Sequence, residues 1–353
     1  MQHLPPGPFG TEKITELPFT LSHPAAVLPL MRRPFVPAAL VAGAMAPDVV
    51  YFLDALGVSE TSPRDWYGPL LNATETHSPG LGLVINLPVA IGLVVTYRML
   101  RAPVTALLPS GLRLPRPART TGLPARAHHA MWLLLSALIG IASHLAWDSF
   151  THGDGYLVTH VQALRASAPG GLTVARLLQF ASTALGLAAV ARHLWRRRDR
   201  LRIHDGTDTT ATRLGPVMRW SVVTLLAAAT VLGGAVDARD DFNAYRYVTE
   251  VDYSQPTVVD LGDGASETTY PSRTVRAPWG TLAEGVLTGA AKRAGAAFAV
   301  ALLLYSATWQ IGATRRRSTK ESSPVPLPQP SARSGQCAEP PPHASRSTRR
   351  DRV

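Results

Sequence analysis

Two side chains that can bind a metal ion lie four residues apart in the segment SHLAWD, at His144 and Asp148. A spacing of four residues places both on the same face of a helix, one turn apart. His152 follows just beyond the expected end of the same helix. An imidazole and a carboxylate on one helix face are typical of paired metal ligands, and also of a histidine held by its carboxylate partner. The spacing alone leaves both interpretations open.

Three further side chains of the same types occur earlier in the chain. His77 lies in ETHSPG, immediately before a long apolar segment, Asp48 lies in MAPD, and His23 lies in LSHPAAVLPL. If residues 22–32 and 36–47 form an antiparallel helical hairpin, His23 and Asp48 lie together at its open end. All six side chains can then gather at one end of a helix bundle.

Imidazole and carboxylate groups are the ligands that Zn²⁺ and other borderline divalent metals accept. A metal with an open coordination position would activate water for hydrolysis. Taken singly, each residue also has a plainer interpretation as an interfacial polar side chain or a helix-end residue. Taken together, they predict a metal site, for Zn²⁺ or another divalent metal, formed by His23, Asp48, His77, His144, Asp148 and His152.

The elements that could position these residues are apolar segments long enough to cross a membrane. A helix needs roughly 20 apolar residues to span the hydrocarbon core, because it rises about 1.5 Å per residue. The apolar runs are continuous, which indicates helices and not the alternating strands of a barrel. The sequence therefore predicts an all-α, polytopic membrane helix bundle with five spans at 81–97, 130–150, 172–191, 217–236 and 295–311.

The segment 35–53 is a sixth apolar candidate, but two prolines and an aspartate interrupt it. It forms either the second arm of the N-terminal hairpin or a complete sixth span. A complete span would place the preceding Arg32 and Arg33 in the cytoplasm, where basic residues are common. It would also separate His23 from the other five site residues, so the expected convergence favours the hairpin.

The distribution of charge predicts how the bundle is oriented. The net charge is +11, but the arginines concentrate in 98–129, 192–214 and the C-terminal tail, whereas acids outnumber arginines in 237–285. Basic short loops stay in the cytoplasm. We therefore expect a bacterial-type cytoplasmic membrane protein with a cytoplasmic C-terminus and with 54–80, 151–171 and 237–285 outside. Its expected partners are membrane lipids, and this placement of charge argues against nucleic acid.

The composition along the chain predicts four regions. Residues 1–20 are a polar lead, 21–195 carry the motifs, and 196–312 add further membrane helices with an extracytoplasmic insert at 237–285. We expect that insert to be a small cap or an irregular loop. Residues 313–353 are rich in Pro, Ser and Arg, which is typical of a disordered cytoplasmic tail. The only cysteine, Cys337, lies in that tail, which excludes an intrachain disulfide.

Four motifs in order resemble one uncharacterised bacterial integral-membrane family, catalogued as domain of unknown function 4184. They are PFTLSHPAAVLPL (18–30), GAMAPDVVYFL (43–53), THSPGLGL (76–83) and SHLAWDSFTH (143–152). The resemblance covers roughly 17–195, and 196–353 match nothing beyond a membrane context. More remotely, the pattern is similar to inner-membrane metal-dependent hydrolases and to zinc-dependent phospholipase C. These similarities imply metal ligands at the six residues above, but a second downstream HxxxE pair is missing, which argues against a three-metal cluster.

Three functions from different classes fit the sequence. The first is a metal-dependent hydrolase acting at the outer membrane face on a lipid or phosphoester. The second is a cation or proton transporter, although the chain shows no internal repeat and the polar residues are expected at one face. The third is a structural or partner-binding membrane protein whose polar residues pack the helices.

Overall fold

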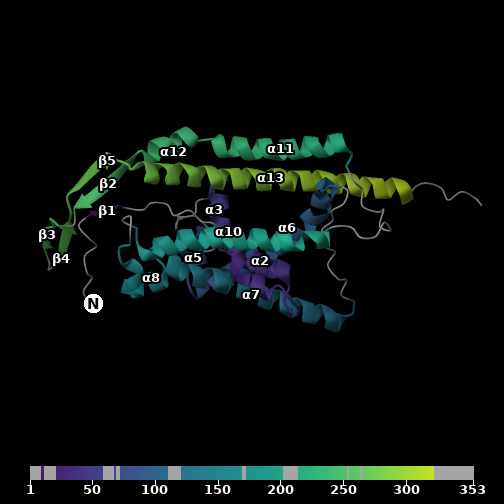
Figure 1. Cartoon of the computed structure of the whole chain (residues 1–353), viewed down its shortest axis with the longest axis horizontal. Coiled ribbons are helices and arrows are strands. Elements are labelled where there is room, and N and C mark those ends of the chain that lie inside the picture. Colours follow the sequence, from purple (N-terminus) through teal and green to yellow (C-terminus); the bar gives the residue numbers. More distant parts are fainter. Residues whose placement is uncertain are drawn as a thin grey trace, which may run out of the picture. The chain divides into compact units, whose positions relative to one another are not determined.

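The structure is a computed structural model, and it describes residues 9–11, 21–58, 67–68, 72–109, 121–168, 172–201, 214–252, 254–262 and 265–321. Within these ranges, five helices are long and apolar enough to cross a membrane (Figure 1). They are α6 (Leu81–Leu107), α7 (Leu123–Thr151), α10 (Val174–Leu201), α11 (Pro216–Ala235) and α13 (Trp279–Glu321). The all-α polytopic bundle with five spans is therefore confirmed.

The N-terminal segment forms the hairpin and not a continuous sixth span. Its first arm is α1 (Pro24–Val27) followed by the 3-10 helix η1 (Leu28–Leu30), and its second arm is α2 (Pro37–Met45). The chain then bends at Pro47 before α3 (Val49–Asp54). Nine helical residues extend only about 14 Å, half of a hydrocarbon core of about 30 Å. The alternative of one complete span over 35–53 is wrong, because α2 ends before Pro47.

Small residues let α2 pack closely against α7 and α6. Gly43 and Gly140 face each other where α2 crosses α7, and a Cβ atom added to either would overlap backbone atoms of the other helix. Ala39, Ala137 and Ile141 are fully buried at this crossing. In a membrane, where lipid tails are as apolar as leucine, such close backbone approach is a main source of helix association.

Short helices link the long ones near the site residues. They are α5 (Ala73–Thr76) before α6, and α8 (Tyr156–His160) and α9 (Gln162–Arg165) between α7 and α10. The asparagine at 72 accepts a hydrogen bond from the backbone N–H of Thr74 and so caps α5. These turns position the residues that flank the long helices.

The segment between α11 and α13 contains regular structure. It holds α12 (Ala238–Tyr245), β2 (Tyr247–Asp252), β3 (Thr257–Gly262), β4 (Ala265–Thr269) and β5 (Ser272–Arg276). Strand β2 pairs antiparallel with β5 and with β1 (Phe9–Thr11), while β3 and β4 form a separate hairpin (Figure 1). Of the two expected forms of the insert, the irregular loop is therefore wrong.

Helix α13 is longer than the predicted span 295–311 at both ends. It begins at Trp279, inside the expected insert, and continues to Glu321. The expectation of disorder from residue 313 is therefore wrong for 313–321, because the apolar helix propagates into the basic segment that follows. The remaining tail, 322–353, lies outside the described residues, as do 1–8 and 12–20 of the expected lead.

Candidate metal centre

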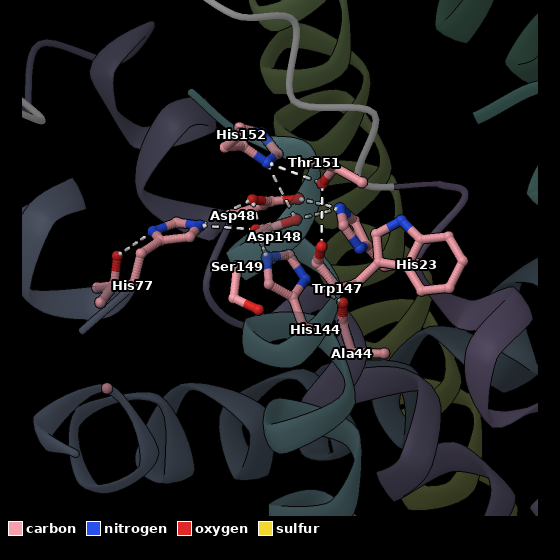
Figure 2. Close-up of polar contacts among 12 residues, drawn as sticks. His23, Ala44, Asp48, His77, His144, Trp147, Asp148, Ser149, Thr151 and His152 are labelled. Atoms are coloured by element: carbon pink, nitrogen blue, oxygen red, sulfur yellow. Dashed lines mark hydrogen bonds and ion pairs between the residues drawn. The ribbon is translucent and has the colours of Figure 1, made fainter. Parts of the chain in front are cut away.

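All six predicted site residues converge at one place, as Figure 2 shows. His144 and Asp148 come from successive turns of α7, and His152 follows the end of that helix. His77 ends α5, just before α6 begins, and Asp48 occupies the bend between α2 and α3. His23 immediately precedes α1. The hairpin brings its two ends together, which places His23 and Asp48 on the same side of the cluster as predicted.

Four of these side chains present one atom each to a common point. His144 Nε2 lies 3.4 Å from Asp48 Oδ1 and 2.9 Å from Asp148 Oδ2. His77 Nε2 lies 3.4 Å from the same Asp48 oxygen and 3.6 Å from the same Asp148 oxygen. Ligands about 2.1 Å from a tetrahedral zinc are about 3.4 Å apart. The four imidazole–carboxylate distances are therefore close to those of a tetrahedral ligand set, and all four atoms lie within 4.8 Å of one another.

The backbone fixes which nitrogen of two histidines faces the cluster. His144 Nδ1 lies 2.8 Å from the carbonyl oxygen of Ala44, and His77 Nδ1 lies 2.9 Å from that of Ala73. A carbonyl can only accept, so each Nδ1 carries a proton and donates it. In a neutral ring Nε2 is then left with its lone pair directed at the carboxylates. Histidine ligands of metal ions are held in this way, by a hydrogen bond from the other ring nitrogen.

This arrangement needs a positive charge between the rings and the carboxylates. A nitrogen lone pair and a carboxylate oxygen about 3 Å apart repel each other unless a proton or a metal ion lies between them. Asp48 is 2 % exposed and His144 is 1 % exposed, so water screens little of this repulsion. His144 Nε2 also has no hydrogen bond within the described part of the chain. The donor set, its spacing and its burial fit a divalent cation.

Burial also sets the charge states at the edge of the cluster. Burial, followed by the neighbouring His144 ring, lowers the pKa of His23 to about 4. His23 is therefore neutral near pH 7, the form that binds metals. Burial alone would raise the pKa of Asp48, but the adjacent His144, His77 and His23 rings outweigh it and hold that pKa well below its usual range. A neutral His23 imidazole beside an ionised Asp48 carboxylate is the pair of charge states in which these two groups bind a metal ion.

A chain of hydrogen bonds from α10 gives His152 a different role. Arg176 donates to Gln179 Oε1 at 2.6 Å, which leaves the Gln179 NH₂ group to donate to His152 Nε2 at 3.4 Å. With Nε2 accepting, the other ring nitrogen of His152, Nδ1, carries a proton and lies 3.3 Å from Asp148 Oδ1. His152 is thus placed to orient Asp148. Arg176 in turn pairs with Glu284 of α13.

Three supporting residues were missed by sequence reasoning. Asn86 of α6 is fully buried and donates to the carbonyl oxygen of Thr76 at 2.7 Å, which holds the turn that carries His77. Gln179 and Arg176 belong to the chain just described. All three are polar residues in or beside an apolar helix, a signal that marks functional positions in membrane proteins. A search restricted to His and Asp could not have found them.

A small pocket adjoins the cluster on one side. It is lined by Ser22, His23, Trp147, Thr151, His152, Gln179, Ser182 and Thr183. The space inside it that a water molecule can occupy is about 10 Å³. A cavity needs about 10–15 Å³ of such space to hold one water molecule. The pocket therefore has room for about one water-sized group, and not for a complete lipid.

Comparison with known families agrees with the motifs. Residues 17–307 match the family described as Domain of unknown function (DUF4184). The chain belongs to this family. The match extends well past residue 195, so the expectation that the rest of the chain matches nothing is wrong, and α11 and most of α13 are part of the family domain. No curated protein and no solved structure matches the chain. The remote similarity to hydrolases and phospholipase C stays a prediction.

Proposed function

We propose that this membrane protein is a metal-dependent hydrolase in which Asp48, His77, His144 and Asp148 hold a divalent metal ion. The observation that carries the proposal is the pair of Nε2 atoms aimed at two carboxylate oxygens, 2.9–3.6 Å away, from rings whose Nδ1 protons are committed to backbone carbonyls. Packing residues would instead satisfy one another with hydrogen bonds. When bound, the ion would supply Lewis acidity and an activated water.

The reaction class that suits this site is hydrolysis of a phosphoester. The water oxygen forms a bond to phosphorus, the bond from phosphorus to the ester oxygen breaks, and the leaving oxygen takes up the proton that the attacking water loses. Gln179 lines the adjoining pocket, and its NH₂ group has a second hydrogen, beyond the one directed at His152, that can be donated to a phosphate oxygen. We place the site at the outer membrane face, because His77 precedes α6 and Asp148 lies in the last turn of α7, at the helix ends opposite the arginine-rich loops.

Metal analysis and a hydrolysis assay on the detergent-purified protein test this proposal. We expect bound divalent metal, and metal-dependent hydrolysis of phospholipids or simple phosphodiesters. His144→Ala should abolish both, because it removes the most buried ligand. His128→Ala is the matched control, since His128 belongs to the same helix but is exposed and pairs with Trp132. Metal content that is zero, or equal in wild type and His144→Ala, would refute the metal centre.

The assay also separates the hydrolase from the alternatives. Bound metal with no hydrolysis, together with metal or proton flux in proteoliposomes that Asp148→Asn abolishes, would favour a transporter. Loss of thermal stability in His144→Ala, with no metal bound in the wild type, would favour a packing role. The proposal requires metal and turnover to disappear together in a variant that still purifies as a folded protein.

A further inference from the structure

The carboxylates of Asp48 and Asp148 each contribute one oxygen to the proposed metal centre, together with the Nε2 atoms of His77 and His144. Each carboxylate also has a second oxygen that is not among these four ligand atoms. These atoms, Asp48 Oδ2 and Asp148 Oδ1, are buried. Asp48 Oδ2 has no hydrogen-bond partner among the residues that the structure describes, and the nearest donor to Asp148 Oδ1 is His152 Nδ1, 3.3 Å away. Leaving such oxygens unpaired away from water is costly. Both residues are more than nine-tenths buried. The two atoms therefore point to a further positive ligand beside the first.

His23 faces these two oxygens from the opposite side of the cluster to His77. His23 Nε2 lies 3.6 Å from Asp148 Oδ1 and 3.9 Å from Asp48 Oδ2. Two atoms that each lie 2.1–2.2 Å from one ion can be at most about 4.3 Å apart. Both distances are within that limit. They are too long for direct hydrogen bonds, because a donor and an acceptor about 3.6 Å or more apart do not form one.

We infer that the site holds a second divalent cation, bound by His23 Nε2, Asp48 Oδ2 and Asp148 Oδ1 and bridged to the first by both carboxylates. This inference rests on the proposed metal centre and makes it dinuclear. Bridged pairs in hydrolytic sites are about 3.5–4 Å apart. Three protein ligands leave open positions at the second cation, as catalytic sites do. The proton on His152 Nδ1 can still be donated to Asp148 Oδ1, which has a second lone pair.

Contacts of its neighbour Ser22 and of its own ring hold His23 in place. Its neighbour Ser22 packs directly against α10 at Gly186, where an added Cβ would come within 3.0 Å of both the Cβ and the carbonyl oxygen of Ser22. The His23 ring lies against the His144 ring, with centroids 3.9 Å apart. His23 is 8 % exposed. The N-terminal arm of the hairpin thus packs against both α10 and α7, on either side of the proposed position of the second cation.

The second cation also explains where a substrate would enter. The two aspartates carry a charge of −2, so one divalent ion makes the set neutral, whereas two make it +2 and attractive to an anion. The pocket is lined by His23 and not by His77, and it therefore opens on the second position. Its other lining residues include the hydroxyls of Ser22, Thr151 and Ser182. We therefore assign the substrate class as anionic esters, with phosphoesters foremost.

Manganese binding tests the second position without relying on activity. The purified protein is stripped with a chelator, reloaded with Mn²⁺ and analysed for metal per chain and by electron paramagnetic resonance. We expect two Mn²⁺ per wild-type chain and the exchange-coupled signal of a bridged pair. His23→Ala should bind one Mn²⁺ with an uncoupled signal. His77→Ala is the matched variant at the first position and should also lose the coupling.

The outcomes distinguish this inference from the proposed function. One uncoupled Mn²⁺ per wild-type chain, unchanged in His23→Ala and lost in His144→Ala, would overturn the second position and keep the first. No bound Mn²⁺ in any form, and no other divalent metal in the protein as purified, would overturn both. If His23→Ala fails to purify as a folded protein, the wild-type signal still decides, because an uncoupled single ion contradicts a bridged pair.

Discussion

Replacing Gly140 with alanine should weaken metal binding although Gly140 contacts no ion. A Cβ at this position would lie 2.3 Å from the carbonyl oxygen of Leu40 and 2.8 Å from the backbone nitrogen of Ala44. Relief to an ordinary contact of about 3.4 Å requires α2 to move from α7 by about 1 Å. That movement carries Asp48 away from His144. In the structure the ligand atoms of these two residues, Asp48 Oδ1 and His144 Nε2, are 3.4 Å apart.

The expected effect on affinity follows from how narrowly metal sites tolerate displacement. Ligand distances must hold within about 0.2 Å, so a shift of about 1 Å is several times too large. The same movement stretches the hydrogen bond that orients His144, now 2.8 Å from the Ala44 carbonyl. Changes in such supporting contacts weaken metal binding by about 10–100-fold. The overpacked helix crossing should also lower the free energy of unfolding by about 1–3 kcal/mol.

Competition with a chromophoric chelator measures the zinc affinity, and thermal unfolding in detergent measures stability. Gly92→Ala is the matched control, because a Cβ at Gly92 in α6 meets nothing within 4 Å. It should leave zinc affinity unaltered. The reasoning fails if Gly140→Ala folds and binds zinc as tightly as the wild type, since the close approach of α2 to α7 would then not set the ligand spacing.

Three further predictions concern the turn before α6, the orientation and the pH dependence. Asn86→Leu removes the donor to the Thr76 carbonyl and leaves this buried acceptor unpaired, at a cost of about 1–3 kcal/mol. Because the lost hydrogen bond holds the turn that carries His77, zinc binding should weaken. Unaltered zinc affinity in the chelator assay would contradict this. A membrane-impermeant thiol reagent should label Ser266→Cys, made in a Cys337→Ser background, on intact cells. In the wild-type protein the same reagent should label Cys337 only after lysis. The opposite pattern would reverse the predicted orientation. In the metal-free protein, His23 takes up a proton below about pH 6.5 when the chain is unfolded, but only near its pKa of about 4 when the chain is folded. The free energy of unfolding should therefore fall by about 3 kcal/mol from pH 6.5 to pH 4, and should fall less in His23→Gln. Parallel pH dependence of unfolding in the two proteins would contradict this prediction.

The sequence by itself determined the elements and the types of site residue. Continuous apolar runs of about 20 residues have one stable solution in a bilayer, so the five spans followed from length and composition. The spacing of His144 and Asp148 placed both on one helix face because the helical period is fixed at about 3.6 residues. Pro47, which cannot continue a helix, already marked where 35–53 would break. These features depend only on local chain geometry and on the solvent.

Only the tertiary structure decided how those residues could act. Which ring nitrogen of His144 faces the carboxylates depends on the backbone carbonyl of Ala44, which lies 100 residues away in the sequence. The roles of Gly43 and Gly140 became visible only where two helices cross, because a glycine has no side chain whose pattern could reveal a contact. The separation of the carboxylate oxygens into two sets also arises from long-range packing, since each set draws on three segments. Periodicity gives the direction of a side chain on its own helix, but the atoms it meets are set by distant parts of the chain.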